Sequence, residues 1–506
     1  MDNESIIQAG ADYHWKTAYD RNRMSGHYLD WENQPLPFKK YSGIETHAFP
    51  PVSQYPEKSL WSLVSGPKAQ SGSAALNQDS MARLLYLSGG ITAKSRQAGG
   101  DFYFRAQASA GALYPTELYA GVVEATDLKP GLYHFSADHF GLSLLRQGAF
   151  AHFLAEMGVT ADTDRPPTAS FFLSGIFFRS AWKYRARAYR YVLLDTGHLL
   201  ENLVLVLASQ ELAFTCHYDF EDDKLGRLLG MDDQREVGLV CINVLNGPLT
   251  VAEAEPDVNP LPPEILAAGG VSKNEVVYDD MMQMHREGIC IPASARKLGS
   301  MSSHIGVTAT DWALVQNTTA DEHELPHAQA VLHRRSKRNY VNRTLEKKTF
   351  IRLLDLLCRS HGRSGVDDRF ACLAVGFLTG NIDGFDPGFY LLDPENRRFG
   401  QVTTGDLIEP MTSVCLDQRW LDNAAVHFLL MANLKVIDDH YGARGYRYAM
   451  LNAGRLGQLI YLGATALGLG CCGIGALYDC DAQKLLGLNQ DSALLYLVAA
   501  GPVKRL

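Results

Sequence analysis

Apolar and polar positions recur along the chain with two different periods, which together predict helices and strands. Apolar residues are spaced as on one face of a helix at 80–90 and 350–362, and both runs end at glycine, a usual helix stop. Short β-branched runs at 117–125 and 237–245 predict strands. The mixture predicts an α+β fold.

The longest apolar runs follow two similar arginine–tyrosine motifs. They cover residues 196–212 and 452–470, and they are long and apolar enough to form central buried helices. Each helix would then organise one half of the chain.

Three unrelated short patterns recur at one constant separation. Tyr191 and Tyr448, which close the two arginine–tyrosine motifs, are 257 residues apart (448 − 191). Two further patterns have the same separation, Pro-Gly-x-Tyr (130–133 and 387–390) and Leu-Leu-Gly (228–230 and 485–487). A shared register indicates a tandem duplication. Two homologous halves are expected to pack face to face, as an intramolecular pseudo-dimer.

The duplication divides the chain into four predicted parts. Copy one is expected at 61–250 and copy two at 325–506, and each copy closes on Gly-Pro. Residues 1–60 form an N-terminal extension. Residues 251–324 form a linker and insertion whose start is rich in proline, which favours an extended connector.

Composition narrows the class of protein. Apolar residues make up 46% and charged residues 20% of the 506 residues, as in a globular protein. The net charge of −9 argues against a nucleic-acid or anionic-membrane binder, which would need a concentrated basic surface. Nine scattered cysteines and a start without an apolar core favour a cytoplasmic, soluble chain, and the cysteine and histidine spacing supports no metal site.

Three motifs carry a family resemblance. They are WKYRARAYRYVLLDTGH (182–198), RAQASAGALYPTELY (105–119) and HRRSKRNY (333–340). Together they resemble the nitroreductase-fold flavoproteins, most closely the thiazole/oxazole-forming oxidase branch, also called SagB-type dehydrogenases. This resemblance implies two tandem nitroreductase-like domains and the cofactor FMN.

The basic motif and the small-residue loop divide the expected cofactor contacts between the two copies. A flavin phosphate accepts the donors that Arg334, Arg335, Ser336 and Arg338 could supply at the head of the following helix. Ser109, Ala110 and Gly111 would let the backbone approach a flat ring, with Pro115 at the exit into a strand. A solvated basic patch and a plain tight loop are the alternative readings.

The resemblance also implies that a flavin lies between two protomers, with the basic motif from one and the small-residue loop from the other. Copy two has Val-Asp-Asp-Arg-Phe-Ala-Cys (366–372) in place of the small-residue loop. Copy one has Val-Ser-Gly-Pro-Lys (64–68) in place of the basic motif. The losses are complementary, so one complete composite site is expected per chain and the second site should be empty.

The remaining candidate residues are Lys183, Tyr184, Ile474 and Gly475. The resemblance implies that Lys183 and Tyr184 serve in catalysis, because removing hydride from a ring carbon to flavin also needs a base. A structural lysine–tyrosine pair is the alternative. Ile474 and Gly475 match positions near the flavin edge. The surrounding Gly-x-Gly-x-x-Gly follows a predicted helix, so it is not a dinucleotide-binding motif.

The function expected from these motifs is an FMN-dependent dehydrogenase of azoline-like or peptide-derived substrates. An NAD(P)H-dependent nitro- or quinone-type reductase is one alternative, and a flavin-free peptide-binding subunit of a modification complex is another. Residues 140–180 are expected to include part of the substrate pocket. No nucleic-acid or membrane partner is expected, and the chain could act as a monomer.

Overall fold

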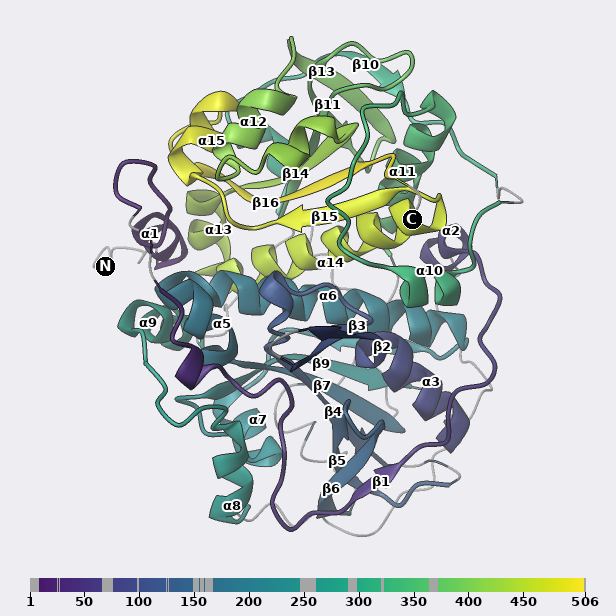
Figure 1. The fold of residues 1–506 in the computed structure, drawn as a ribbon, viewed down its shortest axis with the longest axis vertical. Helices are drawn as coiled ribbons and strands as arrows, with labels where there is room; N and C mark the ends of the chain where they lie inside the picture. Colours follow the sequence, from purple (N-terminus) through teal and green to yellow (C-terminus); the bar gives the residue numbers. More distant parts are fainter. Residues whose placement is uncertain are drawn as a thin grey trace, which may run out of the picture.

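The computed structural model consists of two similar halves stacked on each other (Figure 1). It describes residues 9–504 except 25, 27, 66–75, 98–99, 124, 126, 149–153, 155–158, 160–166, 246–260, 290–297, 320–322 and 364–371. Two long helices lie side by side between the halves, and a sheet lies on the outer side of each. This is the α+β pseudo-dimer that the sequence predicts.

Each half is built on a seven-stranded antiparallel sheet with the same strand order. In spatial order, the first sheet contains β1 (Thr46–Ala48), β6 (Gly141–Gln147), β5 (Gly131–Ser136), β4 (Thr116–Val122), β7 (Ala169–Ile176), β9 (Glu236–Val244) and β8 (Phe214–His217). The second contains β10 (Thr310–Leu314), β13 (Arg398–Thr404), β12 (Gly388–Asp393), β11 (Ala374–Thr379), β14 (Val426–Asn433), β16 (Ser492–Gly501) and β15 (Gly470–Ile474). A separate hairpin joins β2 (Ile91–Gln97) to β3 (Gly100–Arg105).

The helices repeat between the halves as well. Those of the first half are α1 (Ala9–Lys16), α2 (Leu60–Val64), α3 (Gln78–Gly89), α5 (Phe177–Tyr184), α6 (Ala188–Ser209) and α7 (Asp222–Leu229). Those that follow are α8 (Pro263–Leu266), α9 (Asp279–Glu287), α10 (His327–His333), α11 (Lys347–Ser360), α12 (Ile408–Val414), α13 (Leu434–Tyr441), α14 (Arg444–Ala466) and α15 (Asp479–Leu485).

The predicted separation of 257 residues is confirmed by matching elements. Strands β7 and β14 differ by 257 at both ends, and helices α5 and α13 do the same. The predicted helices are confirmed as α3 and α11, and the predicted strands as β4 and β9. The two long helices begin earlier than the apolar runs, because the arginine–tyrosine motifs form their first turns.

The two long helices cross where two glycines meet. Gly197 on α6 and Gly454 on α14 occupy equivalent positions of the duplication. A Cβ atom on Gly197 would lie 2.1 Å from the Leu451 carbonyl oxygen, and one on Gly454 would lie 2.1 Å from that of Leu194. Only glycine allows this backbone-to-backbone contact.

The duplicated motif ties the halves together reciprocally. Arg187 and Arg190 bind the Asp479 carboxylate at 2.7 Å, and Arg187 also donates to the Gly475 carbonyl. The equivalent arginines of copy two, Arg444 and Arg447, bind Asp222 of copy one. The repeated arginines of each copy are therefore ties to a carboxylate and to a backbone carbonyl of the other copy.

The segments outside the predicted copies complete the two halves. Strand β1 pairs with β6, and β10 pairs with β13, so each half gains an edge strand. Helix α1 packs across the interface on α13 and α14, while α9 packs on the residues that precede α6. Their histidines face equivalent tyrosines, His14 with Tyr446 and His285 with Tyr189. The predicted linker start and the segments 66–68 and 366–371 lie outside the described residues.

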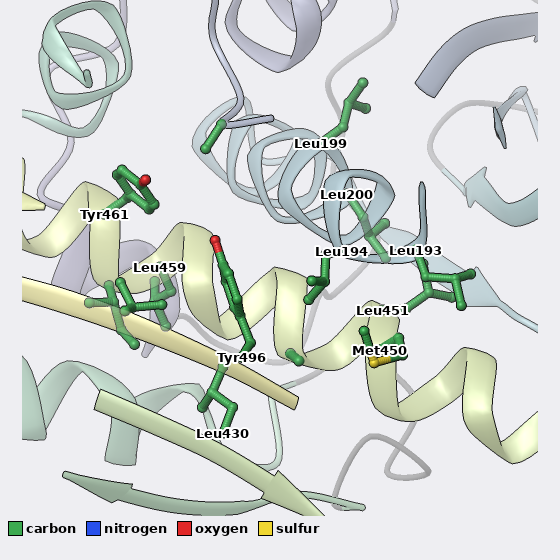
Figure 2. Packing of buried hydrophobic residues seen from close by; sticks show 14 of the residues in the cluster. Leu193, Leu194, Leu199, Leu200, Leu430, Met450, Leu451, Leu459, Tyr461 and Tyr496 are labelled. Carbon is green, nitrogen blue, oxygen red and sulfur yellow. The ribbon is translucent and has the colours of Figure 1, made fainter. Parts of the chain in front are cut away.

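One continuous core joins the halves. Buried residues of both copies belong to the same cluster, and Figure 2 shows Leu194 of α6 between that helix and α14. The run Phe177–Ser209 is long and apolar enough to cross a membrane, but 94% of its apolar window is buried inside the protein, as in a core helix.

Candidate active site

A cavity at the interface brings together most of the predicted residues. Its volume is about 150 Å³. From copy one it is lined by Ser109, Ala110, Gly111 and Tyr184, and from copy two by Ser336, Arg338, Ile474 and Gly475. The structure therefore places the small-residue loop of one copy opposite the basic motif of the other.

The small-residue loop is held by a buried carboxylate on α6. The Ser109 hydroxyl donates to Asp195 at 2.5 Å, and the Ala110 N–H donates to the same carboxylate at 3.1 Å. The Ser109 oxygen in turn accepts the Tyr114 N–H at 2.9 Å. The serine side chain thus closes the loop, and the loop backbone is left to line the cavity.

Gly111 presents a bare backbone surface to the predicted catalytic pair. Its φ of +65° favours glycine. A Cβ atom there would lie 3.0 Å from the Tyr184 hydroxyl oxygen and 3.2 Å from Lys183 Nζ. Both functional atoms therefore lie against the loop, although Lys183 itself does not line the cavity.

Burial shifts the pKa values of Lys183 and Tyr184 in opposite directions, and each shift favours the uncharged form. Desolvation, together with the nearby charge of Arg338, lowers the pKa of Lys183. Desolvation raises the pKa of Tyr184 well above its usual value. The ring of Tyr184 packs against that of Tyr191, with centroids 4.0 Å apart. At neutral pH, Tyr184 is a neutral hydrogen-bond donor, and Lys183 is the group whose pKa moves toward neutrality.

The basic motif is extended and does not start a helix. Helix α11 begins only at Lys347, and Ser336 instead forms a bridge to Cys471 beside β15. The prediction that the motif lies at the head of the following helix is wrong, because the chain leaves α10 as a strand-like segment against copy two's sheet. The motif therefore offers no helix N-terminus to a phosphate.

The four predicted side chains of this segment have different surroundings. Ser336 and Arg338 line the cavity. Arg334 is buried and donates to the carbonyls of Ala106 at 2.9 Å and Arg105 at 3.0 Å, so it anchors the start of the small-residue loop. Arg335 donates to Thr92 of the β2–β3 hairpin. Neither arginine lines the cavity.

A hydrogen-bond chain orients the Ser336 hydroxyl. The Gly473 N–H donates to the Tyr461 oxygen at 2.7 Å, and the hydroxyls of Tyr461 and Ser336 are 2.9 Å apart. Because Tyr461 already accepts one bond, its own proton is best placed on the Ser336 oxygen. The Ser336 proton then remains for an anion in the cavity.

The cavity floor is a neutral polar network that crosses the interface. His198 Nδ1 lies 2.7 Å from Gln458 Oε1, and His198 Nε2 lies 3.0 Å from the Tyr496 hydroxyl. Burial lowers the pKa of His198 to about 4, so the ring is neutral. Since Gln458 Oε1 can only accept, His198 carries its proton on Nδ1 and accepts from Tyr496. Figure 2 shows Tyr461 on α14 and Tyr496 of β16 against the same helix.

The equivalent position of the other half has different chemistry. Asn452 and Arg455 replace Asp195 and His198, and Glu201 replaces Gln458. Glu201 binds Arg455 at 2.9 Å and Arg363 at 2.6 Å, a buried ion network in place of a neutral floor. These residues border a larger cavity of about 660 Å³, which none of the predicted residues lines. We place the site at the smaller cavity because its donors and bare backbone suit a flat anionic ligand.

The donor set fits a flavin phosphate, but the cavity is small. Ser336 offers a hydroxyl proton and Arg338 a guanidinium, while the loop and residues 473–476 offer backbone and small side chains. Ordinary ligand pockets measure roughly 300–1,000 Å³. A ligand of flavin size therefore requires the lining to move, or it extends beyond the enclosed part.

Sequence reasoning missed several lining residues. Asp195, Tyr191, His198, Tyr461 and Tyr496 all line the cavity. Tyr191, Asp195 and His198 lie within the motif of residues 182–198, but that motif did not mark them as site residues, and Tyr461 and Tyr496 lie in apolar runs outside any motif. The signal available was a charged or hydrogen-bonding residue in a run otherwise expected to be buried.

Comparisons with known proteins define the class. A model of the nitroreductase family matches residues 98–243 and 391–502, one region in each half. These regions cover half of the chain, and the protein belongs to the nitroreductase family.

Individual relatives agree with this assignment. A Methanocaldococcus jannaschii protein described as a candidate nitroreductase is 29% identical over 115 residues, which is 23% of this chain and 58% of that relative's length. A solved structure from Anabaena variabilis, also described as a candidate nitroreductase, has a TM-score of 0.79 and 24% identity over 98% of this chain and 99% of its own. The second comparison supports the tandem fold.

Proposed function

We propose that the protein is an FMN-dependent oxidoreductase with one composite flavin site between its two halves. The observation that carries the proposal is the interface cavity. There, Ser336 and Arg338 of copy two lie opposite the loop of residues 109–111 and Tyr184 of copy one. Lys183 lies beside the same loop.

The residues would divide the work between binding and proton transfer. Ser336 and Arg338 would hold the phosphate, and Ile474 and Gly475 would border the ring. When bound, FMN supplies a two-electron acceptor that takes hydride from an organic substrate. Hydride loss from carbon needs a proton to leave as well, and Lys183 is suited to accept it because its pKa is lowered. Neutral Tyr184 would donate a hydrogen bond that orients the substrate.

We propose the azoline-oxidising branch as the finer assignment. Its support is the Lys183–Tyr184 pair, to which the family resemblance gives a catalytic role and which lies against the small-residue loop. Azoline-containing peptides are therefore the first substrates to assay. NADH and NADPH oxidation is measured in parallel, because a reductase would be fed by these donors.

The first test is flavin content. We expect purified or reconstituted protein to hold about one FMN per chain, measured by absorbance of released flavin against chain concentration. Two FMN per chain would contradict the composite site. No FMN after reconstitution would contradict the cofactor assignment and leave the binding-subunit alternative.

A matched pair of serine variants tests the phosphate contact. Ser336→Ala removes a donor to a charged group, worth about 1.5–3 kcal/mol, so the FMN dissociation constant should rise about 10- to 150-fold. Ser303→Ala removes a hydroxyl that, among the described residues, bonds only the Ser300 carbonyl, and it should leave FMN binding unchanged. Arg334 is the poorer choice, because its loss would also release the Ala106 carbonyl. An unchanged dissociation constant in Ser336→Ala would overturn the phosphate assignment.

A further inference from the structure

Asp195 is a buried carboxylate that forms no ion pair with any residue that the structure describes. Its side chain is on α6, 3% exposed, and lines the interface cavity. Other buried carboxylates, such as Glu117, Asp222 and Asp479, bind arginines directly. Among the residues that the structure describes, no lysine, arginine or histidine nitrogen lies within 4 Å of Asp195. An unpaired carboxylate is costly to bury, so its retention calls for a local reason.

In the part of the chain that the structure describes, the hydrogen-bond partners of Asp195 all belong to the small-residue loop. Its carboxylate accepts the Ser109 hydroxyl and the Ala110 N–H. Ser109 then accepts the Tyr114 N–H, so one carboxylate is connected to both ends of the loop. Between these ends lies Gly111, with its left-handed φ and its contact with Tyr184 and Lys183.

The duplication supplies an internal comparison. The residue of copy two equivalent to Asp195 is Asn452, at the same place on α14. Copy two also lacks the Ser-Ala-Gly-Ala-Leu-Tyr-Pro sequence. Carboxylate and loop are present together in one half and absent together from the other, although the helices pack alike. The carboxylate is therefore tied to the loop, not to helix packing.

We propose that Asp195 is a positioning residue, which holds the loop of residues 109–111 in the conformation that receives the flavin. The inference rests on the proposed function. A loop that is already fixed loses less conformational entropy when FMN binds, so FMN binds more tightly. The fixed loop also keeps Gly111 against Tyr184 and Lys183, so the substrate side of the site depends on the same carboxylate.

A double-mutant cycle tests this role through FMN affinity. Asp195→Ala and Ser109→Ala should each raise the FMN dissociation constant about tenfold, measured by quenching of flavin fluorescence. The double variant should lose less affinity than the sum of the two single variants, because both single variants remove the shared Ser109–Asp195 hydrogen bond. Asp195→Asn keeps the shape and one acceptor oxygen, so it should restore part of the affinity. Asn452→Ala, the matched control, should bind FMN like the wild type.

Melting curves of the FMN-free proteins separate this role from folding. If Asp195→Ala fails to fold, Ser109→Ala and Asp195→Asn still test the proposal. Wild-type affinity in Ser109→Ala and Asp195→Asn, or additive losses in the cycle, would overturn it. So would equal losses in Asp195→Ala and Asn452→Ala. If the wild type binds FMN but the Asp195 and Ser109 variants bind it equally well, only the positioning role is overturned. If the wild type binds no FMN, the proposed function is overturned as well.

Discussion

At the scale of single residues, two buried carboxylates lack a basic partner within 4 Å in the described part of the chain, Asp195 and Asp438. Burial raises the pKa of each to about 7, against hydrogen bonds that lower it. Asp438 accepts the N–H groups of Gly10 and Ala11 at the start of α1. Both carboxyl groups therefore gain or lose a proton near neutral pH in the folded protein.

The raised pKa values predict how stability changes with pH. A carboxyl group whose pKa is raised in the folded state binds more protons there than in the unfolded chain, so its effect lowers stability as pH rises from about 4 to about 7. Asp195→Asn should remove the part of this decrease in stability that Asp195 causes, which is at least about 1 kcal/mol. We expect a smaller decrease in unfolding free energy between pH 5 and 8 in this variant, measured with urea on FMN-free protein. Asn452→Ala should keep the wild-type slope, and an unchanged slope in Asp195→Asn would contradict the assignment.

Residue-level predictions from the sequence were strongest where a motif concentrates chemistry. The sequence found Ser336, Arg338 and the small-residue loop, which all line one cavity. It grouped Arg334 and Arg335 with them, because it could not show that the segment is extended and turns these two side chains toward copy one. Asp195 and His198 escaped because their partners are distant in sequence and their roles exist only after folding.

At the scale of elements, the repeat was the most informative feature. A constant separation of 257 residues located matching strands and helices without any alignment of relatives. The repeat did not reveal how α6 and α14 pack together, because the sequence alone does not show whether a glycine in an apolar helix lies at a helix crossing. The close contact of Gly197 with Gly454 follows from the three-dimensional crossing alone.

The helix crossing gives a sharp stability prediction. Gly197→Ala and Gly454→Ala would each force a methyl group against a backbone carbonyl, so the helices must separate. Each should lower the unfolding free energy by about 3 kcal/mol or more, measured by urea denaturation. Gly226→Ala on α7 is the control, since nothing lies within 4 Å of the added Cβ. It should be neutral or stabilising by up to about 1 kcal/mol. Wild-type stability in Gly197→Ala would show that the helices do not cross there.

At the scale of the whole molecule, equivalent arginines connect the two halves, but only one of these connections reaches the interface cavity. Arg187 binds Asp479 and the Gly475 carbonyl, and Arg444 binds Asp222 and the Tyr218 carbonyl. Gly475 lines the interface cavity, whereas Tyr218 does not. Arg444 therefore only ties the two halves together. Arg187 does the same and also positions the segment that borders the proposed flavin.

This asymmetry separates stability from cofactor binding. Arg187→Ala and Arg444→Ala each leave a buried carboxylate with one arginine fewer, so both should lose about 3–5 kcal/mol of stability in urea unfolding. Only Arg187→Ala should also raise the FMN dissociation constant, by about tenfold, because it releases the Gly475 carbonyl. The comparison is made with folded protein at low temperature, where both variants retain their far-UV circular dichroism. Equal FMN affinity in the two variants would mean that Arg187 does not position the cavity. A loss of affinity in Arg444→Ala as large as in Arg187→Ala would point to a flavin site in the other half.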